Sequence, residues 1–244
     1  MPSKVQKTIH TSRTMMLAEL SRIMAHGIEQ GSFEVSFADN VAGKLSKANK
    51  DKTNKALRKV YSFDPSDPAF AAFLWFWKNS PEADHPILAL LFAISNDFLL
   101  SESIEIVQNT PLNQKVTVES LEDNLARLHP GRYSTVTLRS ISKNLASSWK
   151  QAGFILGKVK NIRVQPEISY RVVTFGMLLG YLEGMRGEFL LASKYIRALC
   201  LPESGARDLI GEAARRDLLQ YQYSGHVTTI LFPNLLKSIG IDGE

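Results

Sequence analysis

The side chains in this sequence that are best suited to chemistry are cations set among short hydrogen-bonding groups. In the stretch TLRSISKNLASSWKQAGFI (residues 137–155), a helix of about 3.6 residues per turn would place Arg139, Lys143 and Lys150 on one face. No Asp or Glu occurs from residue 125 to residue 165. Lys and Arg attract phosphate groups, whereas Ser, Thr, Asn and Gln can contact phosphates or base edges in a major groove that admits one helix. The combination predicts contact with a DNA duplex.

Further polar side chains lie around this face. The start of the helix offers hydroxyl groups and free backbone N–H groups, which can bind phosphate, and the segment after the helix carries three more cations. The predicted DNA-binding set of this region comprises Arg132, Ser134, Thr135, Thr137, Arg139, Ser140, Lys143, Asn144, Ser147, Lys150, Lys158, Lys160 and Arg163. The alternative interpretation is a basic surface that docks an acidic face of a partner protein.

A second basic cluster, GKLSKANKDKTNKALRK, covers residues 43–59 and contains a single acid, Asp51. Two interpretations fit it equally well: a solvated, partly flexible lysine loop, or an arm that binds phosphate. The second interpretation adds to the DNA-binding set Lys44, Lys47, Lys50 and Lys55. A nucleotide-binding phosphate loop is rejected, because the GxxxxGK[ST] pattern requires Gly where Ala38 stands and Ser or Thr where Leu45 stands.

Charge is distributed unevenly along the chain. The net charge of +5 hides a block at 126–171 with nine basic and one acidic side chain, which follows a block at 61–125 with two basic and ten acidic ones. Such asymmetry indicates a polyanionic partner for the basic blocks, although an acidic block could also dock on a basic one within the same fold.

Apolar periodicity, caps and turn residues predict the elements that hold these side chains. In the quoted helix, a cap is expected at Ser134 or Thr135, and the stripe that packs on the preceding helix is Leu138, Ile141, Leu145, Trp149 and Ala152. Two strongly apolar helices are expected at the centre of an N-terminal bundle, and the other helices flank them. Besides the quoted helix at 137–155 with its cap, the expected helices are 12–29, one that follows the lysine cluster and ends near Phe63, 67–78, 85–100, 117–128, 169–183, 193–200 and 204–217. The expected hairpins lie in 154–164 and 218–232.

The order helix, turn, helix, hairpin occurs in the middle of the chain and again at its C-terminus, and is that of a winged helix-turn-helix. The predicted fold class is therefore mainly α (α+β with small hairpins). We expect an N-terminal helical bundle with a basic loop in residues 1–112 and a central winged-helix-like module in 113–168. A linking helix and a C-terminal winged-helix-like module are expected in 169–244. In this module cations alternate with acids, and the mixture of charges favours packing or protein contact over DNA binding.

Composition and spacing argue against several classes of protein. The lone Cys200 excludes an intramolecular disulfide framework, and the five His residues lack metal-ligand spacing. No G-x-S-x-G serine, Cys–His pairing or carboxylate pair at a strand end is present, so we expect no enzyme, no cofactor and no metal. The N-terminus lacks a secretory apolar segment, and the apolar runs 69–77 and 86–94 are about half of the roughly 20 residues that a membrane-spanning helix needs. A cytoplasmic location is expected.

The order of these features resembles the BrxA family, the small proteins of BREX (bacteriophage exclusion) phage-defence systems. The resemblance rests on the G-K-x-S stretch from Gly43 to Ser46, the two apolar helices, the strand at 154–156 and the segment RRDLLQYQYSGHVTTILF at 215–232. It covers nearly the whole chain in pattern and length. It implies a helix-rich, non-enzymatic bacterial protein that binds DNA and is encoded with a DNA methyltransferase, an ATPase and a phosphatase-like partner. It carries over no catalytic residues.

The resulting hypothesis is a non-enzymatic DNA-binding component of a phage-defence complex, with double-stranded DNA and other defence-system proteins as partners and no membrane span. A scaffold or assembly subunit that does not touch DNA is the alternative. RNA binding by the same face is less favoured, because the face lacks the aromatic platform on which single-stranded bases usually stack.

Overall fold

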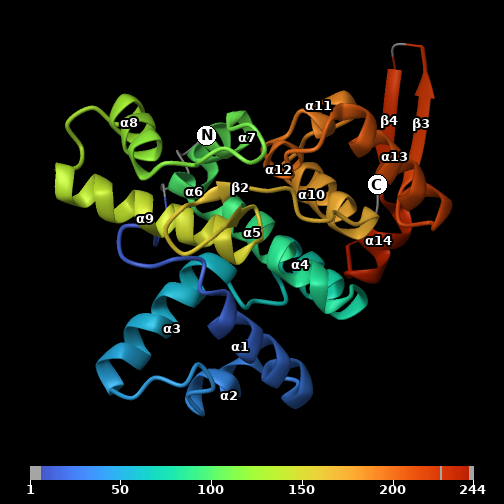
Figure 1. Ribbon diagram of the computed structural model, residues 1–244. Coiled ribbons are helices and arrows are strands. Elements are labelled where there is room, and N and C mark those ends of the chain that lie inside the picture. The colour runs from blue at the N-terminus through green and yellow to red at the C-terminus, as the bar shows by residue number, and fades with distance from the viewer. Residues whose placement is uncertain (1–6, 226, 242–244) are drawn as a thin grey trace.

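Helices make up most of the structure, and the strands in the described residues form two short antiparallel hairpins (Figure 1). The computed structural model describes residues 7–225 and 227–241. The mainly α class predicted from the sequence is therefore confirmed. In Figure 1 the N-terminal helices lie at the bottom, the apolar helices in the middle, and the C-terminal helices and hairpin on the right.

The N-terminal part consists of a nonhelical segment, residues 7–16, called here the N-terminal strap, and three helices. These helices are α1 (Leu17–Gln30), α2 (Phe33–Ala38) and α3 (Lys47–Tyr61). The helix predicted from Ser12 begins only at Leu17, because side chains from other elements bind the strap: the carboxylate of Asp97 accepts from Ile9 N, and the hydroxyl of Ser148 accepts from Met15 N. Most of the lysine cluster belongs to α3, so the flexible-loop interpretation is wrong for it.

Two apolar helices, α4 (Pro68–Asn79) and α5 (His85–Asn96), lie at the centre of the fold, as predicted. A short 3-10 turn connects them. The second helix is shorter than predicted, because Asp97 adopts an extended conformation and its carboxylate caps the next helix. The two short helices that follow are α6 (Phe98–Glu102) and α7 (Ile104–Asn109).

An aromatic cluster joins these helices to both ends of the chain. The ring centroid of Phe73 lies 4.8 Å from that of Phe92 in α5, 6.0 Å from that of Tyr61 in α3, and 6.0 Å from that of Phe175 near the C-terminal side. Aromatic pairs of this kind contribute about 0.5–1.5 kcal/mol each beyond simple burial. The buried apolar residues of the three predicted regions form one contiguous cluster.

The apolar helices also bear on membrane insertion. Within residues 7–225 and 227–241, no single helix has both the length and the apolar character needed to cross a membrane. The pair Glu82–Asn96 and Phe98–Asn109 reaches that length only when taken together, and it is bent by 108°.

The central part contains two packed helices followed by a hairpin. α8 (Val118–Leu128) and α9 (Thr135–Gln151) are capped at their N-termini by the hydroxyl groups of Thr117 and Ser134. β1 (Ile155–Leu156) then pairs with β2 (Ile162–Arg163). Residues 113–116 run along the other edge of β2: Val116 N donates to Asn161 O, and Arg163 N donates to Gln114 O. The segment before α8 thus forms a rudimentary third strand beside the hairpin.

The C-terminal part repeats the order of helices and hairpin. The long strands predicted in 218–232 are confirmed, and they turn at Gly225, whose φ of +63° lies in the left-handed region that glycine tolerates. His226 lies outside the described residues. The elements are α10 (Tyr170–Leu182), α11 (Glu188–Leu191), α12 (Lys194–Ala198), α13 (Glu203–Arg215), β3 (Gln220–Ser224), β4 (Val227–Leu231) and α14 (Pro233–Ser238).

Candidate nucleic-acid interface

The inward face of α9 is the apolar stripe expected from the sequence. Ile141, Leu145, Trp149 and Ala152 are buried, and Leu138 is partly buried against the core. The indole N–H of Trp149 donates to the Ser103 hydroxyl at 2.8 Å, so the largest buried side chain of the helix also has its polar group satisfied. This burial fixes which face of α9 turns outward.

The outward face of α9 carries cations at helical spacing. Arg139, Ser140 and Lys143 are exposed, and Ser147 and Lys150 are partly exposed, on one row that continues to the end of the helix. Lys150 lies in the last turn, where a cation is favoured by the negative end of the helix dipole. The predicted polar face therefore exists on the surface.

The start of α9 is also exposed, but its hydroxyl groups have local roles. Ser134 caps the helix by accepting from Thr137 N, and its Oγ lies 2.9 Å from Thr137 Oγ1. Thr135 is exposed at the first helical position. Arg132 is exposed and lies over the rings of Phe98 and Tyr133, at 5.2 and 5.4 Å from their centroids.

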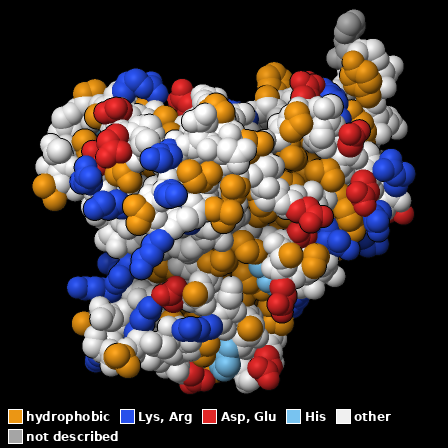
Figure 2. All heavy atoms as spheres, in the orientation of Figure 1, with side chains coloured by type: hydrophobic (Ala, Val, Ile, Leu, Met, Phe, Trp, Pro, Cys, Tyr) orange, Lys and Arg blue, Asp and Glu red, His pale blue; other side chains and the backbone are white. Residues whose placement is uncertain are grey.

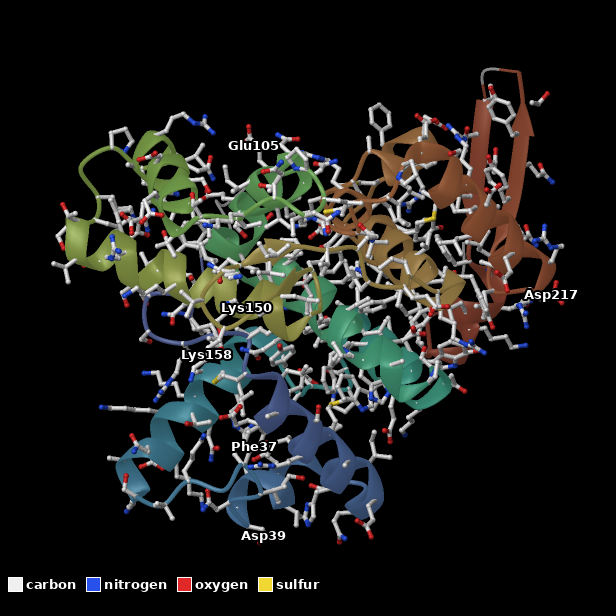
Figure 3. All side chains as sticks on the ribbon, viewed as in Figure 1. Phe37, Asp39, Glu105, Lys150, Lys158 and Asp217 are labelled. Atoms are coloured by element: carbon white, nitrogen blue, oxygen red, sulfur yellow. The ribbon has the colours of Figure 1, made fainter. Side chains whose placement is uncertain are left out.

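The β1–β2 loop, residues 157–161, brings two further lysines close to the end of α9. Lys158 and Lys160 are exposed, and within the described residues neither makes an ion pair. Lys150 Nζ donates to the backbone carbonyl of Lys158 at 3.2 Å, which holds the loop against the helix. Figure 3 shows Lys150 and Lys158 near each other, above α1 and α3.

Arg163 is not part of this surface, and its prediction as a DNA-binding residue is wrong. The side chain is only 2% exposed. Its guanidinium donates to three backbone carbonyls, those of Val107, Phe154 and Val164, and to the Gln165 side chain. In the short strand β2 this residue points inward, so its guanidinium makes four hydrogen bonds to the protein instead of contacting phosphate.

Asn144 is likewise held by the protein. Its side-chain amide donates to the carbonyl of His10 in the N-terminal strap at 2.9 Å. About two turns further along α9, the side-chain carbonyl oxygen of Gln151 accepts from Leu17 N at 2.9 Å. The strap therefore covers the flank of α9 that Asn144 occupies, and this partly exposed side chain already spends one N–H on the protein.

A buried polar network, which the sequence did not reveal, anchors the strap. His10 Nδ1 lies 2.8 Å from Asp97 Oδ2, and His10 Nε2 lies 2.8 Å from Ser148 Oγ. Burial by itself raises the pKa of Asp97, but the His10 ring and the N–H groups of Ile9 and Leu100 together hold this pKa below its usual value. No local pattern could predict the network, because its members lie 87 and 138 residues apart.

The network has the residue types and distances of a Ser–His–Asp catalytic triad. Ser148 and His10 are 0% exposed, and Asp97 is 1% exposed. The Ser148 Oγ already accepts from Met15 N at 2.9 Å and lies 3.1 Å from the carbonyl of Asn144. A nucleophile must meet its substrate, so we assign these residues to holding the strap in place.

The charge of Arg139 is partly offset by the preceding helix. Its guanidinium lies 3.8 Å from a carboxylate oxygen of Glu119 and 3.6 Å from one of Glu122, both in α8. Arg139 itself is about half exposed, at 54%. The acids of α8 therefore compete with any phosphate for this arginine.

Removing one of these acids is expected to strengthen DNA binding. Glu119→Gln removes one of the two carboxylates beside Arg139 and leaves that of Glu122, so affinity for duplex DNA should rise about threefold. The slope of log K against log salt should become steeper by up to about 0.9. Fluorescence anisotropy measures both quantities. The matched control is Glu212→Gln, which also removes an acid paired with an arginine, Arg216, but in α13. Equal affinities of the two variants would contradict the prediction.

The lysine cluster divides into two groups. Lys44 pairs with Glu19 at 2.6 Å. Burial raises the pKa of Glu19, but the hydrogen bond from Lys44 and its positive charge keep that pKa below its usual value. Lys50 donates to the carbonyl of Ala38 at 2.7 Å. Lys44 and Lys50 thus hold the N-terminal helices together, whereas within the described residues Lys47 and Lys55 are exposed and form no ion pair.

The C-terminal part has the salt-bridged surface expected for it. Arg207 pairs with Glu203 at 2.8 Å and with Glu188, and Arg216 pairs with Glu212 at 3.0 Å. Among the described residues, no group of three or more His, Cys, Asp or Glu side chains is arranged to hold a metal ion. The concentration of cations lies elsewhere: Figure 2 shows Lys and Arg gathered at the left, over α8 and α9 above and α3 below.

Comparison of the chain with family models, curated proteins and solved structures finds no match.

Proposed function

We propose that the protein is a non-enzymatic DNA-binding component of a bacterial phage-defence (BREX) system, and that it contacts duplex DNA through α9 and the β1–β2 loop. The observation that carries the DNA-binding part is the exposed row Arg139, Lys143 and Lys150, which adjoins exposed Lys158 and Lys160. The phage-defence part, with its methyltransferase, ATPase and phosphatase-like partners, rests on the resemblance to the BrxA family.

The backbone pairing around α9 supports a winged helix-turn-helix. In that fold a strand precedes the helix-turn-helix, and the hairpin after the second helix pairs with this strand. Residues 113–116, α8, α9, β1 and β2 follow the same order, with β2 between the other two segments. In this arrangement α9 is the helix that enters the major groove, and the β1–β2 loop reaches the adjacent backbone.

The charge on this surface supports the same proposal. Lys143, Lys158 and Lys160 form no ion pair within the described residues, so phosphate groups would be their strongest partners. Ser140 and Thr135 are exposed beside them and can donate to phosphates or base edges. An acidic protein face could satisfy the cations, but it would not by itself require a helix that fits a groove.

The test is the salt dependence of binding to a labelled duplex of about 30 base pairs, roughly three helical turns. The variant carries Lys143→Gln, Lys158→Gln and Lys160→Gln; Arg139 and Lys150 are left unchanged because they contact the protein. The wild type is expected to bind with a steep negative slope of log K against log salt. For the variant, this slope should be shallower by up to about 2.7, because each of the three lost phosphate contacts contributes about 0.9.

The matched control removes three exposed cations from other elements: Lys78→Gln in α4, Arg215→Gln in α13 and Lys237→Gln in α14. This control should bind as the wild type does. If the wild type fails to bind at low salt, the DNA-binding proposal is wrong. If the control and the variant lose the same slope, the assignment to α9 and the loop is wrong.

A scaffold role is the second candidate, and one feature of the C-terminal part favours it. Phe189 in α11 is 76% exposed, and Tyr223 and Val227 at the tip of the hairpin are 61% and 64% exposed. Large apolar side chains gathered on a surface are common at protein contacts. An absence of DNA binding at low salt would therefore leave protein docking as the proposed role.

A further inference from the structure

The basic helix α3 carries a second set of exposed cations, and the inference drawn from them rests on the proposed function of α9. The sides of α3 differ in their neighbours. Lys50, Asn54 and Arg58 lie on the side facing α2, where they bind the Ala38 carbonyl, the Phe37 carbonyl and the Glu34 carboxylate. The opposite side carries a row of three lysines at helical spacing: Lys52, Lys55 and Lys59.

Lys59, at the C-terminal end of this row, lies beside the N-terminal strap. Lys59 Nζ donates to the carbonyl of Thr8 at 2.8 Å, and Thr8 belongs to the strap whose next residues bind α9. A carbonyl oxygen leaves the lysine charge unneutralised. Within the described residues Lys52 and Lys55 form no ion pair, so all three cations keep a net charge that a phosphate can meet.

A cleft lies beside the strap and reaches both helices. Its volume is about 570 Å³, and most of its lining comes from the strap and the start of α1, with Thr53 of α3 and with Asn144 and Gln151 of α9. Arg13 of the strap lines it as well, together with the Lys44–Glu19 pair. In the surface view the cations on both sides of this region form one band at the left (Figure 2).

The dimensions decide how DNA would meet this cleft. A duplex whose major groove alone is about 12 Å wide cannot enter a cavity of this volume, so it must lie across the mouth. With α9 in the major groove, a phosphate backbone borders each side of the helix. We propose that the backbone on the α3 side contacts Lys52, Lys55 and Lys59, so that one duplex is held by two separate basic helices.

The test compares the α3 variant Lys52→Gln, Lys55→Gln, Lys59→Gln with the control Lys78→Gln, Arg215→Gln, Lys237→Gln. A duplex of about 24 base pairs, roughly two turns, reaches both helices, whereas one of about 10 base pairs spans a single turn. On the long duplex the α3 variant should bind more than tenfold more weakly, with a slope shallower by up to about 2.7. On the short duplex its loss should be clearly smaller.

A double variant keeps the result interpretable if Lys59→Gln loosens the strap. Lys52→Gln with Lys55→Gln leaves the Lys59 bond to Thr8 intact, and its slope should change by up to about 1.8, at about 0.9 per contact. Stoichiometry is measured on the same samples. One duplex per protein is expected.

The outcomes separate this inference from the proposed function. If the wild type does not bind DNA, the proposed function fails. If it binds, and the α9 variant loses slope while the α3 variant matches the control, only the present inference fails. If the wild type binds two duplexes and the α3 variant binds one with unchanged affinity, α3 serves a second DNA molecule and the inference of a shared duplex is overturned.

Discussion

Replacing Asp97 by asparagine should lower the free energy of unfolding by about 3 kcal/mol or more, because it removes the buried carboxylate of a hydrogen-bonded network. Asp97 accepts hydrogen bonds from the Thr8 hydroxyl, Ile9 N, His10 Nδ1 and Leu100 N. An amide keeps one oxygen and replaces the other by an NH2 group, which would face N–H donors. Urea unfolding monitored by circular dichroism measures the change.

The control is Asp123→Asn on the surface of α8, where the carboxylate is exposed, and its effect should stay within about 0.5 kcal/mol. A similarly small effect of Asp97→Asn would mean that the strap is not held by this network. Loss of the strap should also disturb α9, since Ser148 and Asn144 bind it directly.

The same substitution should change how stability depends on pH. The pKa of Asp97 is lower in the folded protein than in the unfolded chain, where it is about 3.9. The folded state therefore binds this proton less readily than the unfolded chain does. The contribution of Asp97 to the free energy of unfolding is fully present above about pH 4, and it is lost as the pH falls through the folded pKa. The difference in free energy of unfolding between the wild type and Asp97→Asn should become smaller as the pH is lowered below about 4. A constant difference across this range would contradict the pKa direction.

Replacing Phe73 by alanine should cost about 3–5 kcal/mol, as expected for the removal of a fully buried phenyl ring. Phe73 is 0% exposed and contacts rings on α3, α4, α5 and α10. Because its partners come from both ends of the chain, the loss should be shared by the whole molecule. Urea unfolding monitored by tryptophan fluorescence and by circular dichroism should give one coincident transition, displaced to lower urea.

Phe189→Ala is the matched control, because it removes the same ring from a position that is 76% exposed. Its effect should stay within about 0.5 kcal/mol. Two separate transitions, of which only one moves in Phe73→Ala, would show instead that the regions 1–112, 113–168 and 169–244 unfold as independent domains.

The sequence by itself determined the elements and the polarity of their faces. Apolar residues at helical spacing located α4, α5, α9 and α10. The cap predicted at Thr117 is confirmed, and of the two candidates Ser134 and Thr135 the structure selects Ser134. The stripe containing Trp149 fixed the inward face of α9 and so left Arg139 and Lys143 outside. These features are local, because periodicity and capping act over a few neighbouring residues.

The lysines of α3 could have been sorted further from the sequence. Once the cluster is treated as a helix, the spacing of Lys52, Lys55 and Lys59 places them on one row, separate from Lys50 and Arg58. The predicted DNA-binding set contains Lys55 but neither Lys52 nor Lys59, which helical spacing places on the same row. The contact of this row with the strap is visible only through the bond from Lys59 to Thr8.

Only the tertiary structure decided which polar groups remain available for a ligand. Arg163 is turned inward onto backbone carbonyls, Asn144 binds the strap, and Lys44 pairs with Glu19. The His10–Asp97–Ser148 network joins three segments that are far apart in the chain. A buried donor or charge takes whatever partner the packed fold brings to it, since leaving it unpaired costs several kcal/mol, and that partner is set by contacts between distant segments.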